Sequence, residues 1–556
     1  MNKTVFTLII SLLCFFPKAQ DEFITTWKPS NTANILPNNP PFPSSATQAW
    51  APFAGTDYKI SWEEVGYPAH NSTISNVTSQ YQVLLDFGTA HNPIPANATY
   101  TVKVSNGNGN FHRIYFSDDD PTNTIGHLGD NAKIVQINQW GSTVWSSMRN
   151  AFSGCMNLNM TASDIPNLSA VTDMSSMFAG CSSLIGNSSI NSWDISGVTS
   201  LQGIFMSCTV FNQPIGNWNT GNVQNMGTVF LMNQNFNQPI GNWNTSQVTA
   251  MDAMFNNAKS FNQPIGDWDV SNVDEMEFMF ANAWVFNQPL ANWDVSGVWQ
   301  MNHMFLSAKA FNQPIGNWNT SAATVMHGMF YNASVFNQPI GNWNTSNVTS
   351  MNTMFQNASA FNQNIGSWNT SQVNNMSNMF TGAANFNQNL GSWNLSSLVN
   401  AYSIFQNSGL NCQNYDSTLY GWSSNPSTAS NINISSASPM IYTHPAAVNA
   451  RNYLINTKGW TITGDTYDDK CVSALSTQEA AFSDDFSIYP NPASDFIYFK
   501  NLKAAVSYRI FDNSGRLVSK GESEKDRIDI RNLTKGNYIL QITMNKTIKI
   551  LKIVKN

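Results

Sequence analysis

The residues that could support catalysis are scattered along the chain without a recognisable spacing. Seven histidines occur among 556 residues, and none belongs to an HExxH or similar metal-ligating pattern. No serine lies in a G-x-S-x-G elbow, and no glycine-rich phosphate loop is present. Asp118-Asp119-Asp120 could bind calcium, which takes several oxygen ligands, but a solvated loop is the alternative. We therefore predict no catalytic residues, no metal site and no cofactor, and a protein that is not an enzyme.

Aromatic side chains at otherwise polar positions of a repeat are the better indication of a binding site. Trp299 and His303 are four residues apart, and Phe278 occupies the His303 position one repeat earlier. Trp284 interrupts a second polar position. Aromatic residues on an outer face favour a contact patch, with neutral drift of a tolerant surface as the alternative. We predict that Phe278, Trp284, Trp299 and His303 bind an unknown extracellular protein or glycan.

A 25-residue repeat must position these side chains. The phrase F-N-Q-P-I-G-N-W-N-T-S-x-V-x-x-M-x-x-M-F-x-x-A recurs from Phe211 to Phe386. Its M-x-x-M-F-x-x-A part has the i, i+3, i+4, i+7 spacing of a short helix, and Trp268-Asp269-Val270-Ser271 resembles a short strand. One such unit cannot bury a core alone, so the units must stack, with Asn212 and Gln213 starting amide ladders.

The repeated phrase resembles the BspA-like leucine-rich repeat of bacterial surface proteins and mycoplasma lipoproteins, over roughly residues 145–410. The resemblance implies a repeat solenoid, leucine-rich-repeat-like, with a short strand plus a short helix in each rung. It also implies surface display and adhesion. We expect an N-terminal β-rich capping module at 21–140, the solenoid at 141–410, and a C-terminal cap of the solenoid at 411–472.

Both ends of the chain indicate export. Residues 1–20 have the lysine, apolar run and break of a signal peptide, and a lipid-modified Cys14 is a weaker alternative. In an oxidising space, Cys412 and Cys471 could form a disulfide. The remaining cysteines (Cys155, Cys181 and Cys208) each follow a Phe by three residues, where later repeats mostly have Ala, which favours small buried fillers.

After a polar linker at 473–485, residues 486–556 are lysine-rich and β-patterned. This segment resembles the type A sorting domain of the type IX secretion system. The motif residues are Tyr489, Pro490, Asn491, Pro492, Gly515, Arg516, Gly536 and Tyr538. The resemblance implies a C-terminal β-sandwich, the type IX secretion machinery as partner, and passage through the periplasm to the outer cell surface or the medium.

The net charge of −7 argues against nucleic acid as a partner, and no later apolar run is long enough to span a membrane. The sequence thus predicts a secreted or cell-surface repeat protein whose solenoid face serves adhesion or protein or glycan binding. The alternatives are a structural surface-layer component and an accessory part of a secreted glycan-active enzyme. Whether the protein stays anchored or is released is open.

Overall fold

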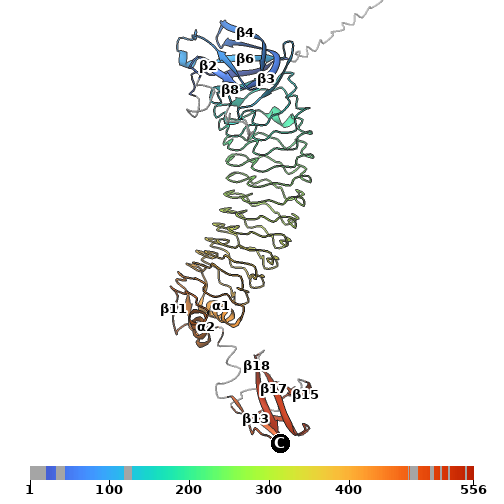
Figure 1. Cartoon of the computed structure of the whole chain (residues 1–556), viewed down its shortest axis with the longest axis vertical. Coiled ribbons are helices and arrows are strands. Elements are labelled where there is room, and N and C mark those ends of the chain that lie inside the picture. Colours follow the sequence, from blue (N-terminus) through green and yellow to red (C-terminus); the bar gives the residue numbers. More distant parts are fainter. Residues whose placement is uncertain are drawn as a thin grey trace, which may run out of the picture. The chain divides into compact units, whose positions relative to one another are not determined.

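The computed structural model describes residues 21–32, 44–117, 128–473, 475, 486–500, 506–513, 516–523, 526–544 and 547–556 (Figure 1). The predicted signal peptide, Asp118-Asp119-Asp120 and most of the predicted linker lie outside these residues. The chain divides into two compact units, residues 1–363 with 372–384, and residues 364–371 with 385–556. The predicted module boundaries, which this division does not test, stay predictions.

The first unit begins with a β-sheet module. Its main sheet has the strand order β4-β3-β6-β1-β8-β9, with β7 paired to β3, and β2 pairs with β5 in a small second sheet. The strands are β1 (Phe23–Trp27), β2 (Gln48–Ala51), β3 (Phe53–Glu64), β4 (Tyr67–Ser79), β5 (Val83–Asp86), β6 (Tyr100–Ser105), β7 (Asn110–Ile114), β8 (Ile134–Gln139) and β9 (Asn159–Met160). A short 3-10 helix, η1 (Pro95–Asn97), precedes β6. Alternate residues of β1 and β6 face a fully buried aromatic core.

The repeats that follow are coils built from turns (Figure 1). Successive coils are joined by isolated parallel bridges 25 residues apart, such as Asn225 to Ala250 and Ala250 to Glu275. Alternate backbone N–H groups donate to the next coil: Met251 to the Glu275 carbonyl at 3.2 Å and Phe255 to the Met279 carbonyl at 2.9 Å. Intervening N–H groups close turns within the coil, and each coil therefore depends on its neighbour for half of these hydrogen bonds.

The predicted leucine-rich-repeat-like solenoid, with a short strand plus a short helix in each rung, is wrong. In the repeats from residue 200 to 400, the structure has turns and single bridge residues where the helix and strand were expected. Ala253 has φ 48° and Asn257 has φ 60°, a left-handed conformation that a right-handed helix excludes. Consecutive turns closed from residue i to i+3 bring Met251, Met254 and Ala258 to the same buried side, which is why the spacing mimics a helix.

The interior of the coils is a set of parallel aromatic columns. Trp243 and Trp268 stack with ring centroids 6.4 Å apart and an interplanar angle of 2°. The indole Nε1 of Trp268 donates to the Ile240 carbonyl of the preceding coil at 3.2 Å. Further columns of Phe and Met are fully buried beside the Trp column. Stacking thus buries large aromatic area, and the indole N–H of each column member from Trp218 to Trp343 donates to the preceding coil, whereas Trp193 Nε1 has no partner among the described residues.

An amide ladder runs beside these columns, as the sequence predicts. The Asn237 side-chain oxygen accepts the backbone N–H of Asn262 at 3.0 Å and the side-chain N–H of Gln263 at 3.0 Å. The same pattern recurs one coil later from Asn262 to Asn287 and Gln288. The recurring Asn-Gln pair therefore binds coil to coil.

The buried side chain of Asn233 destabilises the coils. Asn233 is 0% exposed, and neither its side-chain oxygen nor its side-chain nitrogen has a hydrogen-bond partner among the described residues. The equivalent positions hold Ala258, Ala283 and Ala308. A buried polar group without a partner costs about 1–3 kcal/mol.

We therefore expect Asn233→Ala to raise the free energy of unfolding by about 1–3 kcal/mol. Thermal unfolding of the two proteins measures the effect, and Asn257→Ala, at a half-buried left-handed position, is the comparison that should lower stability instead. A lower melting temperature for Asn233→Ala would show that the amide is satisfied in solution.

The second unit carries the α-helices that the structure describes, α1 (Cys412–Ser424) and α2 (Pro445–Asn456). Asn411 caps α1 by accepting the Asn414 N–H, and Pro445 begins α2. Trp422 of α1 continues the indole pattern, donating to the Leu390 carbonyl at 2.9 Å. Two short strands, β10 (Ile441–Tyr442) and β11 (Thr466–Tyr467), pair in parallel here. Within the described residues, neither helix is long and apolar enough to cross a membrane.

Residues 486–556 of this unit form two sheets, β12-β13-β16 and β15-β14-β17-β18. The strands are β12 (Ser487–Tyr489), β13 (Phe496–Lys500), β14 (Ser507–Asp512), β15 (Leu517–Glu522), β16 (Arg527–Asp529), β17 (Gly536–Met544) and β18 (Thr547–Lys555). Side chains from both sheets, including Ile497, Ile510 and Leu540, share one buried core.

Candidate binding face

Aromatic rings replace small or polar side chains on the outside of three successive coils. The rings of Phe278 and His303 stack with centroids 4.6 Å apart, and His327 meets His303 edge-on at 4.6 Å. Gly328 follows His303 at the next equivalent position, where a Cβ would collide with the imidazole. The coil that follows the ring pair is thus shaped to accommodate His303.

The backbone at this position is left-handed, which is unfavourable for a bulky residue. Phe278 has φ 55° and His303 has φ 56°. Equivalent residues in other coils include Gly328 and Asn378, which adopt this conformation at lower cost. The chain therefore keeps two large rings where Gly or Asn would relieve strain.

Trp299 and Trp284 occupy other positions of the outer surface. Trp299 is 40% exposed and lies beside Thr324, whose hydroxyl donates to the Trp299 carbonyl at 3.4 Å. The helix that was expected to align Trp299 with His303 is absent, since residues 299–303 form a bridge and a turn. Trp284 lies between two ammonium groups, with Lys259 Nζ 4.4 Å and Lys309 Nζ 4.7 Å from the ring centroid. The four predicted residues thus lie at three outer positions, and the ring pair joins only Phe278 and His303.

Carboxylates lie next to the ring pair. Glu277 accepts a hydrogen bond from the Asn302 side chain at 3.0 Å. Burial and the charges of Asp274, Asp252 and Glu277 raise the pKa of Glu275. Burial and the charge of Glu277 likewise raise the pKa of Asp252. The face therefore combines half-buried aromatic rings with like charges that are held close together.

The partly buried imidazole of His303 makes the free energy of unfolding depend on pH. Burial and the neighbouring His327 lower the pKa of His303 from 6.5 to about 4. The unfolded chain takes up a proton below about pH 6.5, whereas the folded chain resists it until about pH 4, so stability falls as the pH falls through this window. With allowance for solvent screening of this half-buried ring, we expect a loss on the order of 1 kcal/mol by pH 5.

His303→Asn removes this proton uptake and leaves Asp252, Glu275, Glu277 and His327 in place. We expect the melting temperature of the variant to fall less between pH 7 and pH 5 than that of the wild type. Parallel pH profiles for the two proteins would contradict the assignment.

Sequence reasoning missed one buried polar cluster in the β-sheet module. Glu64 accepts hydrogen bonds from His70 Nδ1 at 2.5 Å and from the backbone N–H groups of His91 and Asn92 at 2.8 Å each. Burial would raise the pKa of Glu64, but these hydrogen bonds lower it overall. The scattered histidines gave no spacing by which to find this cluster. Because its carboxylate is fully bonded, the cluster fastens the segment at residues 91–92 to the sheet.

The cysteines fall into two groups. Cys412 and Cys471 are joined in a disulfide, while Cys155, Cys181 and Cys208 are free and fully buried. The Sγ of Cys208 donates to the Phe178 carbonyl at 2.9 Å. In the part of the chain that the structure describes, no group of three or more His, Cys, Asp or Glu side chains is placed to hold a metal ion.

The predicted sorting-motif residues mostly brace the C-terminal sheets. Asn491 donates to the Lys552 carbonyl at 2.9 Å and accepts the Val554 N–H at 2.8 Å, which ties it to β18. The Tyr538 hydroxyl donates to the Thr534 carbonyl at 2.8 Å. Tyr489 is half exposed, and Pro490 and Pro492 lie on either side of Asn491. Arg516 forms an ion pair with Asp512. Gly536 is the first residue of β17. Gly515 lies outside the described residues.

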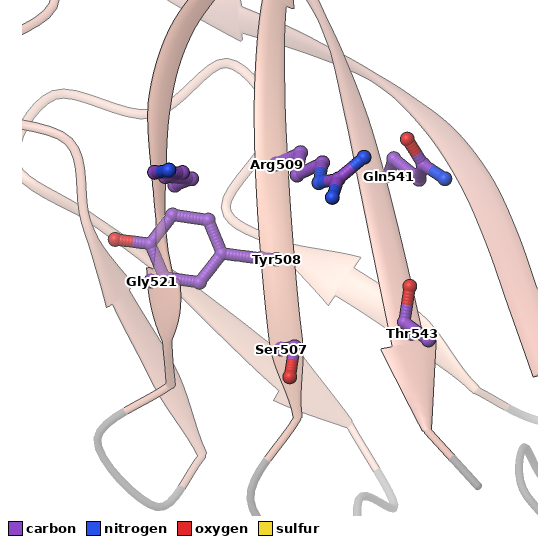
Figure 2. A pocket seen from close by; sticks show the side chains of 7 residues that line it. Ser507, Tyr508, Arg509, Gly521, Gln541 and Thr543 are labelled. Carbon is purple, nitrogen blue, oxygen red and sulfur yellow. The ribbon is translucent and has the colours of Figure 1, made fainter. Parts of the chain in front are cut away.

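A hollow of about 630 Å³ lies on the sheet β15-β14-β17-β18. Its lining residues are Ser507, Tyr508, Arg509, Lys520, Gly521, Gln541 and Thr543. Figure 2 shows Arg509 reaching from β14 toward Gln541 on β17, while the Tyr508 ring lies toward Gly521 on β15. A Cβ at position 521 would lie 3.1 Å from the Tyr508 hydroxyl, so glycine leaves room for that ring.

Two family models match parts of the chain. Residues 146–244, 215–315 and 310–422 match the family described as "Mycoplasma protein of unknown function, DUF285". Residues 487–556 match the family described as "Secretion system C-terminal sorting domain". A search of curated proteins finds no match to the chain. The chain therefore carries three DUF285 repeat segments followed by a type IX C-terminal sorting domain, which directs its export to the outer surface or the medium.

Proposed function

We propose that this exported protein binds an extracellular protein or glycan through the outer surface of its repeats, and that it has no catalytic activity of its own. The contact residues are Phe278, Trp299 and His303, with the neighbouring carboxylates of Glu275 and Glu277. On this proposal the repeats are related in function to those of BspA-like surface proteins, which the sequence resembles. The type IX machinery delivers the protein, and periplasmic passage precedes its display.

The observation that carries the proposal is the Phe278–His303 ring pair in left-handed backbone. A left-handed conformation costs about 1–2 kcal/mol for a residue with a Cβ, and stacking of two rings returns about 0.5–1.5 kcal/mol. Ring stacking alone therefore does not repay the left-handed backbone at these two residues. Trp299 is exposed and the ring pair is half-buried, and aromatic residues that a partner can cover are frequent anchors of protein contacts, which supports a binding role.

The test is capture of the partner by the full exported protein and by a triple variant, Phe278→Ser, Trp299→Ser and His303→Ser. Immobilised wild-type protein is presented with extracellular proteins and with a glycan array. We expect the triple variant to lose at least about tenfold in affinity for whatever the wild type retains, since anchors of this kind contribute about 2 kcal/mol or more.

A matched control changes the same positions in other coils: Thr249→Ser, Thr349→Ser and Thr353→Ser. This variant should bind as the wild type does, because those positions carry no aromatic ring. Equal capture by all three proteins would refute the assigned face, and loss in both variants would indicate that the coils themselves had been damaged.

A further inference from the structure

The exposed face of the sheet β15-β14-β17-β18 carries positive charge that forms no ion pair within the described residues. Arg509 and Lys520 lie directly opposite each other in the antiparallel pair of β14 and β15. Both are exposed, and neither forms an ion pair within the described residues. Like charges placed directly opposite across strands destabilise a sheet. The pair therefore works against folding of the domain.

Apolar side chains share this exposed face. Ile539 is 42% exposed and Ile550 is 67% exposed. Gln541 of β17 lies opposite Arg509 of β14 and Ile550 of β18, and Ile539 of β17 lies opposite Lys552 of β18. Residues that pair directly, and residues two apart on one strand, point to the same side of a sheet, so all five side chains share the exposed side. The opposite side holds the buried core residues Ile510, Leu540 and Ile542. The exposed side is thus a sheet face with isoleucines among three cations and one carboxylate, Glu522, which lies opposite Ser507.

The hollow adds directed hydrogen-bonding groups to this charge. Ser507, Gln541 and Thr543 line it together with Arg509 (Figure 2), and Lys520 belongs to the same lining. A guanidinium beside an ammonium, with hydroxyl and amide groups around them, matches the carboxylates of an acidic protein surface. The exposed isoleucines match apolar side chains on the same partner.

We infer that this face, centred on Arg509 and Lys520, is the surface by which the sorting domain docks onto an acidic protein surface of the secretion machinery. The inference rests on the sorting-domain assignment and is independent of the binding face proposed on the repeats. A protein occupant is favoured because the domain serves recognition by that machinery. The unfavourable charge pair is then retained because the acidic partner neutralises it during export.

The experiment expresses the full chain in a bacterium that has a type IX system and measures the fraction that leaves the cell. Arg509→Glu with Lys520→Glu should lower that fraction by roughly tenfold or more, because carboxylates would then face carboxylates. Lys500→Glu with Lys535→Glu changes the charge equally at exposed positions away from the hollow, and should leave secretion unchanged. Equal secretion of both variants would overturn the inference.

A second variant separates docking from folding. Arg509→Thr removes the like-charge pair, so the purified full chain should melt at the same temperature as the wild type or higher, while secretion falls. A lower melting temperature with normal secretion would overturn the inference, since the arginine would then serve the fold.

Sedimentation with lipid vesicles tests whether the face binds an anionic membrane surface instead of a protein. The wild-type chain should not sediment with phosphatidylglycerol vesicles more than the Arg509→Glu, Lys520→Glu variant does. Binding of the wild type alone would identify a lipid surface and overturn the protein partner.

Discussion

Removal of residues 486–556 should leave the protein inside the cell, with its repeats folded. The sorting domain has its own buried core, built from side chains of two sheets, so its deletion removes one structural element and spares the rest. Without it, the machinery has nothing to recognise. Fractionation of cells and medium, with detection of the repeats by antibody, measures the result.

The converse fusion is the control for this export prediction. Residues 473–556 joined to an unrelated protein with a signal peptide should carry that protein out of the cell. Undiminished secretion after the deletion would show that export information lies elsewhere in the chain. Retention of both the deletion variant and the fusion would show that the sorting domain needs other parts of this protein.

Trp268→Ala should be among the most destabilising single substitutions in the repeats. The side chain is 4% exposed, stacks on Trp243, and donates its indole N–H to the Ile240 carbonyl. Loss of a buried Trp typically costs about 3–5 kcal/mol, because a cavity remains, and the Ile240 carbonyl keeps only the Trp243 backbone N–H as donor. Thermal unfolding and hydrogen exchange of the coils on either side of residue 268 measure the effect, which stacking should transmit to neighbours.

Trp299→Ala is the matched control, since it removes the same side chain from an exposed position. It should change the melting temperature little. Similar destabilisation by the two substitutions would contradict the division of Trp residues into an interior column and an outer face.

The repeat length and its buried columns could be predicted from the sequence, but the local backbone could not. Apolar spacing at Met251, Met254, Phe255 and Ala258 is common to a short helix and to consecutive turns, because both return the chain to one side every three to four residues. The discriminating feature was the Asn or Gly that recurs one residue before the Ala, as at Asn257 and Gly382. Both residues adopt positive φ, which turns require and helices exclude.

Only some contacts on the outer face could be predicted from the sequence. The contact between Phe278 and His303 could be predicted, because the two residues occupy equivalent positions of adjacent repeats and a fixed repeat length sets the neighbour of every residue. Alignment of Trp299 with His303 depended on a helix, and it failed with the helix. The charge pair of Arg509 and Lys520 depends on strand register within 486–556, which a hydrophobic pattern alone does not fix.

Site-specific photocrosslinking tests the proposed binding face most directly. A benzophenone amino acid placed at Phe278 of the full exported protein should form a covalent adduct with the extracellular partner upon irradiation. The same amino acid at Thr353, the equivalent position three coils later, should form none. Adducts at Thr353 equal to those at Phe278, or adducts at neither position while the partner is captured, would contradict the account.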